Sequence, residues 1–137
     1  MTANLKTSKV LDSFALLAFL NKEAGFEKVR TLLRTAEAAG APLLMNEVNV
    51  GEVFYIIAKA RSLEKAEDFL HRFATLPIKP VSNTFPDLLE AARVKAWFPL
   101  SYADAFAVST ALRSQAIVIT GDPKFHTVEH LVEILWL

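Results

Sequence analysis

Four acidic side chains stand at positions where a carboxylate could take part in chemistry. Asp12 and Asp122 each follow a short apolar run, at the point where a buried strand would stop and a helix begin. Glu52 and Asp104 lie near the starts of two strongly apolar helical patterns. In open α/β sheets, ligands bind beyond the carboxyl ends of the strands. Carboxylates gathered there repel one another, so the pattern predicts a hard divalent cation held by oxygen ligands and a phosphate group as substrate.

Three of these acids also have an ordinary structural explanation as parts of helix starts. Asp122 directly precedes a proline, which is a common way to begin a helix. Asp104 and Glu52 each lie three residues after a capping residue, Ser101 and Asn49 respectively, which is the spacing of a capping box. None of the four acids is decisive individually, and a residue that completes a cap can also face a cleft.

Asp12 has the weakest structural explanation, because Ser13 is better suited to cap the helix that follows. Glu47 is a fifth acid. It closes the second expected strand and could rival Glu52 as a metal ligand or merely be solvated. We favour Glu52, because its place inside an amphipathic helix fixes the direction of its side chain. The conjunction of the four acids is the stronger evidence, since a parallel sheet brings strand ends and helix starts to one edge.

The elements that must position these acids alternate between short apolar runs and helical patterns, which is typical of an α/β fold. Strands are expected at 9–12, 42–45, 78–81, 116–120 and 132–137, and helices at 13–20, 23–39, 49–60, 62–75, 84–96 and 102–114. The run at 116–120 is continuous and β-branched, as in a strand covered on both faces. Prolines at and beside the run at 78–81 place that strand at an edge of the sheet.

Composition limits the class of protein. The 137 residues fit one domain, and the absence of cysteine excludes disulfides and thiolate metal ligands. Fifteen basic residues balance fifteen acidic ones, which argues against general coating of nucleic acid but not against a nuclease whose metal supplies local positive charge. The apolar stretch at 14–20 is too short to span a membrane, so we expect a soluble, cytoplasmic protein.

The sequence gives little support to several other kinds of catalytic site. The sequence contains no G-x-S-x-G nucleophile elbow, and its four glycines stand alone rather than in a phosphate-binding loop. The Asp-x-Asp pattern of a phosphatase is missing after the first strand, where Asp12-Ser13-Phe14 stands instead. His126 and His130 have the spacing of a metal-binding pair, but the polar turn around them favours a surface position.

The segments at 10–17, 49–55, 101–106 and 120–125 resemble, in order, the four signature stretches of the PIN domain. More narrowly, the chain resembles the VapC toxins of type II toxin–antitoxin systems, nearly from end to end. The resemblance implies a three-layer α/β/α sandwich with a central, mainly parallel β-sheet. It also implies a single PIN-like nuclease domain over residues 1–137.

The resemblance further implies an Mg²⁺-dependent endoribonuclease, with Mn²⁺ as a second possible metal, which hydrolyses RNA phosphodiester bonds with metal-activated water. Asp12, Glu52 and Asp104 match the principal metal-binding and catalytic acids of the family, and Asp122 matches its more variable fourth acid. Thr120 matches a small hydroxyl residue that supports the metal or its waters. The implied partners are the RNA substrate, a cognate antitoxin protein and a second copy of the chain in a homodimer.

Two alternatives stay open at this point. The first is a catalytically inactive PIN-fold interaction module, which the presence of all four acids disfavours. The second is a metal-dependent phosphatase acting on small phosphate esters. The surface that would bind RNA is not assigned by the sequence, and Lys124 and Lys59 are candidates only because they lie near the acids in the chain.

Overall fold

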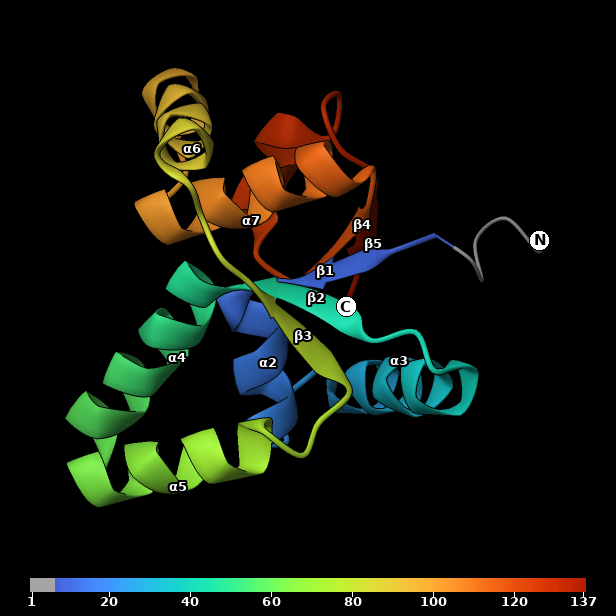
Figure 1. Cartoon of the computed structure of the whole chain (residues 1–137), viewed down its shortest axis with the longest axis vertical. Helices are drawn as coiled ribbons and strands as arrows, with labels where there is room; N and C mark the ends of the chain where they lie inside the picture. The colour runs from blue at the N-terminus through green and yellow to red at the C-terminus, as the bar shows by residue number, and fades with distance from the viewer. Residues whose placement is uncertain (1–6) are drawn as a thin grey trace.

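The computed structural model describes residues 7–137. Five strands form one sheet in the order β3-β2-β1-β4-β5, and every neighbouring pair in it is parallel. Figure 1 shows this sheet crossing the middle of the molecule with helices on both sides. The strands are β1 (Lys9–Leu11), β2 (Leu43–Asn46), β3 (Ile78–Val81), β4 (Ile117–Thr120) and β5 (Ile134–Trp136). The expected strands are therefore all present, with β3 at an edge as its proline predicted.

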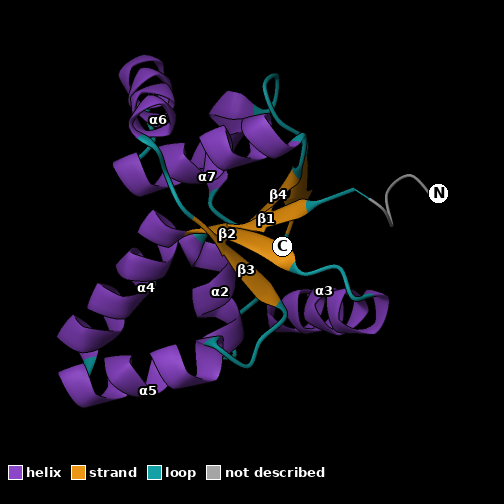
Figure 2. Cartoon of the chain, viewed as in Figure 1, coloured by secondary structure: helices purple, strands orange, loops and turns teal. Residues whose placement is uncertain are grey.

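Helices cover both faces of the sheet. They are α2 (Ser13–Leu20), α3 (Phe26–Ala39), α4 (Glu47–Ala60), α5 (Leu63–Phe73), α6 (Phe85–Trp97), α7 (Tyr102–Ser114) and the 3-10 helix η1 (Pro123–Val128). One face packs against α2 to α5, and the opposite face packs against α6, α7 and η1 (Figure 2). This arrangement confirms the predicted three-layer α/β/α sandwich with a parallel sheet.

The two layers have separate hydrophobic cores because adjacent residues of a strand point to opposite faces of the sheet. Leu11 and Ile119 are fully buried in the core beneath α2 to α5. Their neighbours Val10 and Val118 are fully buried in the core beneath α6 and α7. Strands buried on both faces must be apolar throughout, which explains the continuous runs in the sequence.

Two helices begin at residues other than those predicted. Helix α3 begins at Phe26, three residues later than expected, because Gly25 adopts a left-handed conformation with φ of 95° and serves as its N-cap. Helix α4 begins at Glu47, earlier than expected, because the side chain of Asn46 accepts a hydrogen bond from the Val48 N–H and caps it.

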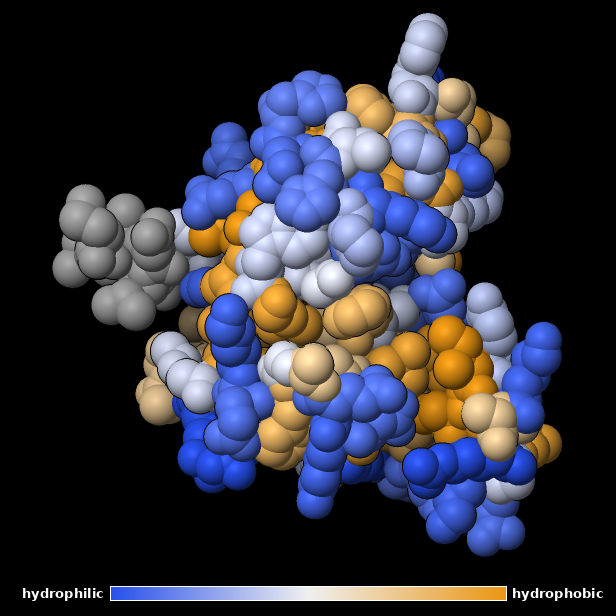
Figure 3. All heavy atoms as spheres, turned by 180° about the vertical axis from the view of Figure 1, so that it is seen from behind, coloured by the Kyte–Doolittle hydropathy of each residue, from blue (hydrophilic) through white to orange (hydrophobic). Residues whose placement is uncertain are grey.

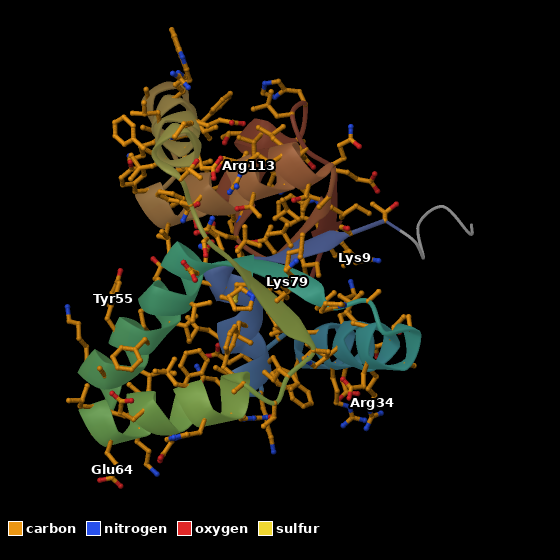
Figure 4. All side chains as sticks on the ribbon, in the orientation of Figure 1. Lys9, Arg34, Tyr55, Glu64, Lys79 and Arg113 are labelled. Atoms are coloured by element: carbon orange, nitrogen blue, oxygen red, sulfur yellow. The ribbon has the colours of Figure 1, made fainter. Side chains whose placement is uncertain are left out.

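A polar network beside β2 joins the sheet to the layer formed by α6 and α7. The buried Asn46 amide donates to Asn83 and to the Thr110 hydroxyl, at 2.7 and 2.9 Å. Arg113 extends from α7 towards α6 and pairs with Asp87 at 3.0 Å (Figure 4). The network holds α6 and α7 in place above the end of β2. No helix within residues 7–137 is both long enough and apolar enough to cross a lipid bilayer.

Candidate active site

Asp12 lies at the carboxyl end of β1, where the sheet register decides its neighbours. Leu11 pairs with Ile119 of β4, so the next residues along the two strands, Asp12 and Thr120, stand side by side. The Thr120 hydroxyl donates a hydrogen bond to Oδ2 of Asp12. The other oxygen, Oδ1, accepts from the Ala15 N–H at 2.8 Å. Asp12 is fully buried, and it is Asp12 rather than Ser13 that caps α2, so the predicted capping role of Ser13 is wrong.

Asp122 is joined to the same hydroxyl from the other side. Its backbone N–H donates to the Thr120 hydroxyl oxygen at 3.0 Å. Its side chain accepts from the Lys124 N–H at 3.0 Å and caps η1, as the following proline predicted. Thr120 thus connects Asp12 to the backbone of Asp122, and both acids stand at the carboxyl edge of the central strands β1 and β4.

Asp104 is brought to this edge by the start of α7. The predicted capping box is confirmed: the Asp104 N–H donates to the Ser101 hydroxyl at 3.1 Å, and the Ser101 N–H donates to Oδ2 of Asp104 at 3.3 Å. Asp104 is only 9% exposed. The cap uses Oδ2 and holds the carboxylate in one direction, while no hydrogen bond within the described residues engages Oδ1.

Glu52 points from the second turn of α4 and is half-buried. The predicted capping box between Asn49 and Glu52 is wrong, because α4 already begins at Glu47 and both residues lie inside the helix. Glu47 itself is exposed at the first position of α4 and lines an apolar groove between α4 and α5. The position of Glu47 therefore gives no support to its role as a rival of Glu52.

The acids act on one another electrostatically. Burial raises the pKa of Asp12 from 3.8 to about 7, against the lowering effect of its hydrogen bonds, and the charges of Asp104 and Asp122 raise it further. Burial also raises the pKa of Asp104, and the charges of Asp122 and Glu52 add to that effect. The structure thus brings the four predicted acids into one electrostatic group, although they come from four different segments.

The group has no basic partner within residues 7–137. The ion pairs found there join Arg30 to Glu27, Arg113 to Asp87 and His126 to Glu129, all outside the group. Two largely buried carboxylates without a counter-charge are costly, because burial disfavours their ionised forms. The cost is removed if a cation binds between them.

The donor set fits a hard divalent cation, which prefers carboxylate oxygens. Within the described residues, however, no three acidic or histidine side chains converge closely enough to form a ready-made metal site. Mg²⁺ does not require such a cage, because it is commonly bound through one or two carboxylates and keeps several waters. A buried amide oxygen without a hydrogen-bond partner, Oδ1 of Asn49, also lies one helical turn before Glu52.

Sequence reasoning missed the structural importance of two buried asparagines, Asn46 and Asn49, both 0% exposed. We interpreted Asn49 only as a helix cap. The signal for a different role was present, because Asn49 stands on the apolar face of a helix, where a polar residue needs partners from other elements. Which elements supply those partners could not be read from the sequence.

Comparison with known proteins supports the fold. Residues 9–131 match the family described as PIN domain. No curated protein sequence matches the chain. Among solved structures, VapBC2 from Rickettsia felis bound to a promoter DNA fragment contains a chain similar to this one, with a TM-score of 0.70 and 12% identity over 94% of this chain and 98% of that one.

Two further structures show the same architecture. DNA-bound VapBC from Salmonella typhimurium has a TM-score of 0.70 and 13% identity over 94% of this chain and 97% of that one. VapC20 from Mycobacterium tuberculosis, described as a toxin that cleaves the sarcin–ricin loop, has a TM-score of 0.70 and 14% identity over 88% of this chain and 95% of that one. At these identities the likeness establishes a shared fold.

Proposed function

Because the chain belongs to the PIN-domain family, we propose that it is a divalent-metal-dependent endoribonuclease and the toxin component of a type II toxin–antitoxin pair. The observation that carries the proposal is the pair of largely buried carboxylates, Asp12 and Asp104, at the carboxyl edge of a parallel sheet without a basic partner in the described residues. We propose that residues 1–137 form one nuclease domain and that the protein acts in the cytoplasm.

In this proposal Asp12 and Asp104 hold the metal, Mg²⁺ or Mn²⁺, and Glu52 and Asp122 complete its surroundings. A bound divalent metal lowers the pKa of a coordinated water and neutralises negative charge that develops on a phosphate group. Thr120 keeps Oδ2 of Asp12 in a fixed direction through its hydroxyl. The capping bond from Ser101 does the same for Asp104, which leaves the Oδ1 atom of Asp104 available to a cation.

Glu52 has a different task, because it is half-buried and not fixed by a hydrogen bond from another described residue. A carboxylate with this freedom can accept a proton from an attacking water or orient that water by accepting its hydrogen bond. Asp122 is also partly exposed, and its backbone is anchored to Thr120. We propose that both residues would lie close to the RNA phosphate when a metal is bound.

The choice of RNA and of a protein partner rests on the structural neighbours. One of them is a toxin that cleaves the sarcin–ricin loop, and others are VapBC complexes. An apolar groove of about 560 Å³, lined by α4, α5 and Pro80, offers a surface that an antitoxin could cover. On the opposite face of the molecule from Figure 1, Figure 3 shows further hydrophobic side chains gathered over the part that holds α4 and α5. We further propose a homodimer.

The test is to incubate the purified protein with RNA, with DNA and with a small phosphate ester, each with Mg²⁺, with Mn²⁺ or with a chelator. We expect cleavage of RNA only, and only when a metal is present. Hydrolysis of the small ester alone would identify a phosphatase. Absence of cleavage together with absence of metal binding in a calorimetric titration would identify an inactive interaction module.

A further inference from the structure

The side chain of Asn49 lies at a junction of three helices and is fully buried. Its Nδ2 donates to the backbone carbonyl of Ala103 at 3.0 Å and to the hydroxyl of Ser13 at 3.3 Å. The Ser13 hydroxyl in turn donates to the backbone carbonyl of Asn49 at 3.3 Å. Ser13 follows Asp12 directly, and Ala103 directly precedes Asp104. One amide therefore joins the two helix starts that carry the buried acids.

Asn49 also lies close to a third acid, Glu52, because both residues belong to α4. Asn49 and Glu52 are three residues apart in α4, so their side chains leave neighbouring positions on one side of the helix. The hydrogen bonds of Asn49 thus fix α4 against the starts of α2 and α7. The element contacts agree with this, because α4 packs against both α2 and α7.

The orientation of the Asn49 amide is determined by its surroundings. The carbonyl oxygen of Ala103 can only accept a hydrogen bond, so the NH₂ group must face it. Turning the amide over would place two acceptor oxygens against each other. In the orientation that remains, Oδ1 is buried and has no hydrogen-bond partner among the described residues. Such a group is costly unless a donor arrives from elsewhere.

We propose that Asn49 is a positioning residue of the metal site: its NH₂ group holds the starts of α2 and α7 together, and its free Oδ1 accepts a hydrogen bond from a water of the bound metal. The inference rests on the proposed function. Ionised carboxylates cannot supply the missing donor, because they only accept hydrogen bonds, and no hydrogen bond from the Asp12 carboxyl reaches Oδ1 within the described residues. Waters on a divalent cation are strong donors, and outer partners of this kind orient and tune metal sites.

The test is a calorimetric Mn²⁺ titration of the full chain carrying Asn49→Leu, which keeps a side chain of similar size and removes both amide atoms. We expect Mn²⁺ to bind about 10- to 100-fold more weakly than to the wild type, as for other outer partners of metal sites. Ser13→Ala serves as a milder second variant. It removes one of the two hydrogen bonds of the Asn49 NH₂ group and should weaken Mn²⁺ binding in the same direction.

The matched control is Asn46→Leu, the same substitution at an equally buried asparagine of the neighbouring network. Its side-chain partners are Asn83, Thr110 and the Val48 N–H, none of which adjoins an acid of the group. This variant should lower the unfolding temperature while Mn²⁺ affinity stays at the wild-type value. A purely structural role of Asn49 would make the two variants behave alike.

The outcomes separate this inference from the proposed function. If the wild type binds no Mn²⁺, the proposed function fails and the role of Asn49 fails with it. If the wild type binds Mn²⁺ and the folded Asn49→Leu protein binds it equally well, only the role of Asn49 is overturned. If Asn49→Leu does not fold, Ser13→Ala decides, and unchanged Mn²⁺ affinity in that variant overturns the inference.

Discussion

Asp12 is an acid whose chemistry depends on where it is buried rather than on its neighbours in sequence. Two hydrogen bonds favour its ionised form, yet burial outweighs them and raises its pKa to about 7. Below pH 4 the carboxyl is protonated in both the folded and the unfolded chain, and burial then carries no charge penalty. Between pH 4 and 7 the unfolded chain ionises while the folded one stays protonated, so the folded state loses relative stability.

We therefore expect the free energy of unfolding in chelator to contain a contribution from Asp12 that falls as pH rises from about 4 to 7. Its upper limit is about 4 kcal/mol, from the shift of the Asp12 pKa. Asp12→Asn should remove this contribution, because the amide cannot ionise; its oxygen can still accept the Ala15 N–H, while its NH₂ group would have to donate to the Thr120 hydroxyl instead. Urea unfolding across this pH range measures it. If the free energy of unfolding changes with pH in the same way for the wild type and for Asp12→Asn, then Asp12 is ionised in the folded protein.

Asp104 is the acid for which a structural role and a catalytic role can be separated most clearly. Asp104→Asn keeps the shape of the side chain and an oxygen that can accept the Ser101 N–H, but it removes the negative charge. We expect metal-dependent RNA cleavage to fall at least ~100-fold, as when one major electrostatic group leaves a reaction centre. The unfolding temperature in chelator should stay equal or rise, because repulsion within the acid group is relieved.

The structure supplies a matched control for this change. Asp87 occupies the same capping-box position at the start of α6, but it pairs with Arg113 and lies outside the acid group. Asp87→Asn should leave RNA cleavage unchanged and lower the unfolding temperature slightly. Wild-type cleavage by the Asp104→Asn protein would mean that Asp104 is only a cap.

At the scale of elements, the junction between β4 and η1 sets the position of Thr120 and Asp122. Gly121 stands between them, and a Cβ atom added there would lie 2.5 Å from the ring of Phe14 at the start of α2. A side chain at position 121 would force the ring of Phe14 to move. Glycine here therefore serves packing rather than backbone freedom.

We expect Gly121→Ala to destabilise the protein by about 1–3 kcal/mol, the usual cost of overpacking. RNA cleavage should also fall, since the displaced junction carries Asp122 and also Thr120, whose hydroxyl donates to Asp12. The same substitution in a Phe14→Ala background should cost markedly less, because the clash is then absent. Thermal unfolding of the two single variants and the double variant measures this coupling. Additive losses would show that Phe14 is not the obstacle.

At the scale of the whole molecule, the equal numbers of acidic and basic residues limit how RNA can be bound. Under the proposed function, a chain with no net charge gains little from general release of counterions, and a bound metal would provide much of the local attraction. With a metal bound, the edge of the sheet where the acids gather would attract phosphate. Binding should then depend strongly on the metal and weakly on salt.

We expect the logarithm of the affinity of the wild-type protein for an uncleavable RNA analogue, measured with Mn²⁺, to fall with the logarithm of salt concentration with a slope no steeper than about −3. Lys124→Ala should make the slope shallower if Lys124 contacts a phosphate. Lys28→Ala is the control, because Lys28 donates to the Trp136 carbonyl from α3. A slope far steeper than this would reveal a basic RNA-binding surface.

Local features of the amino-acid sequence are enough to predict the alternation of strands and helices, the edge position of β3 and the capping roles of Asp104 and Asp122. These features depend on local rules: apolar periodicity, the missing N–H of proline, and the reach of a side chain to a backbone N–H three residues away. The sequence also marked the four acids, because each stands at the end of an apolar run or the start of a helix.

The surroundings of those acids, by contrast, follow from the way distant segments pack together. The register of β1 against β4 places Thr120 beside Asp12, and no local rule specifies a pairing between residues 108 positions apart. The start of α4 at Glu47 turned Asn49 from an expected cap into a buried link between two other helices. Burial and charge at a site are sums over segments distant in sequence, so they exist only once the chain is packed.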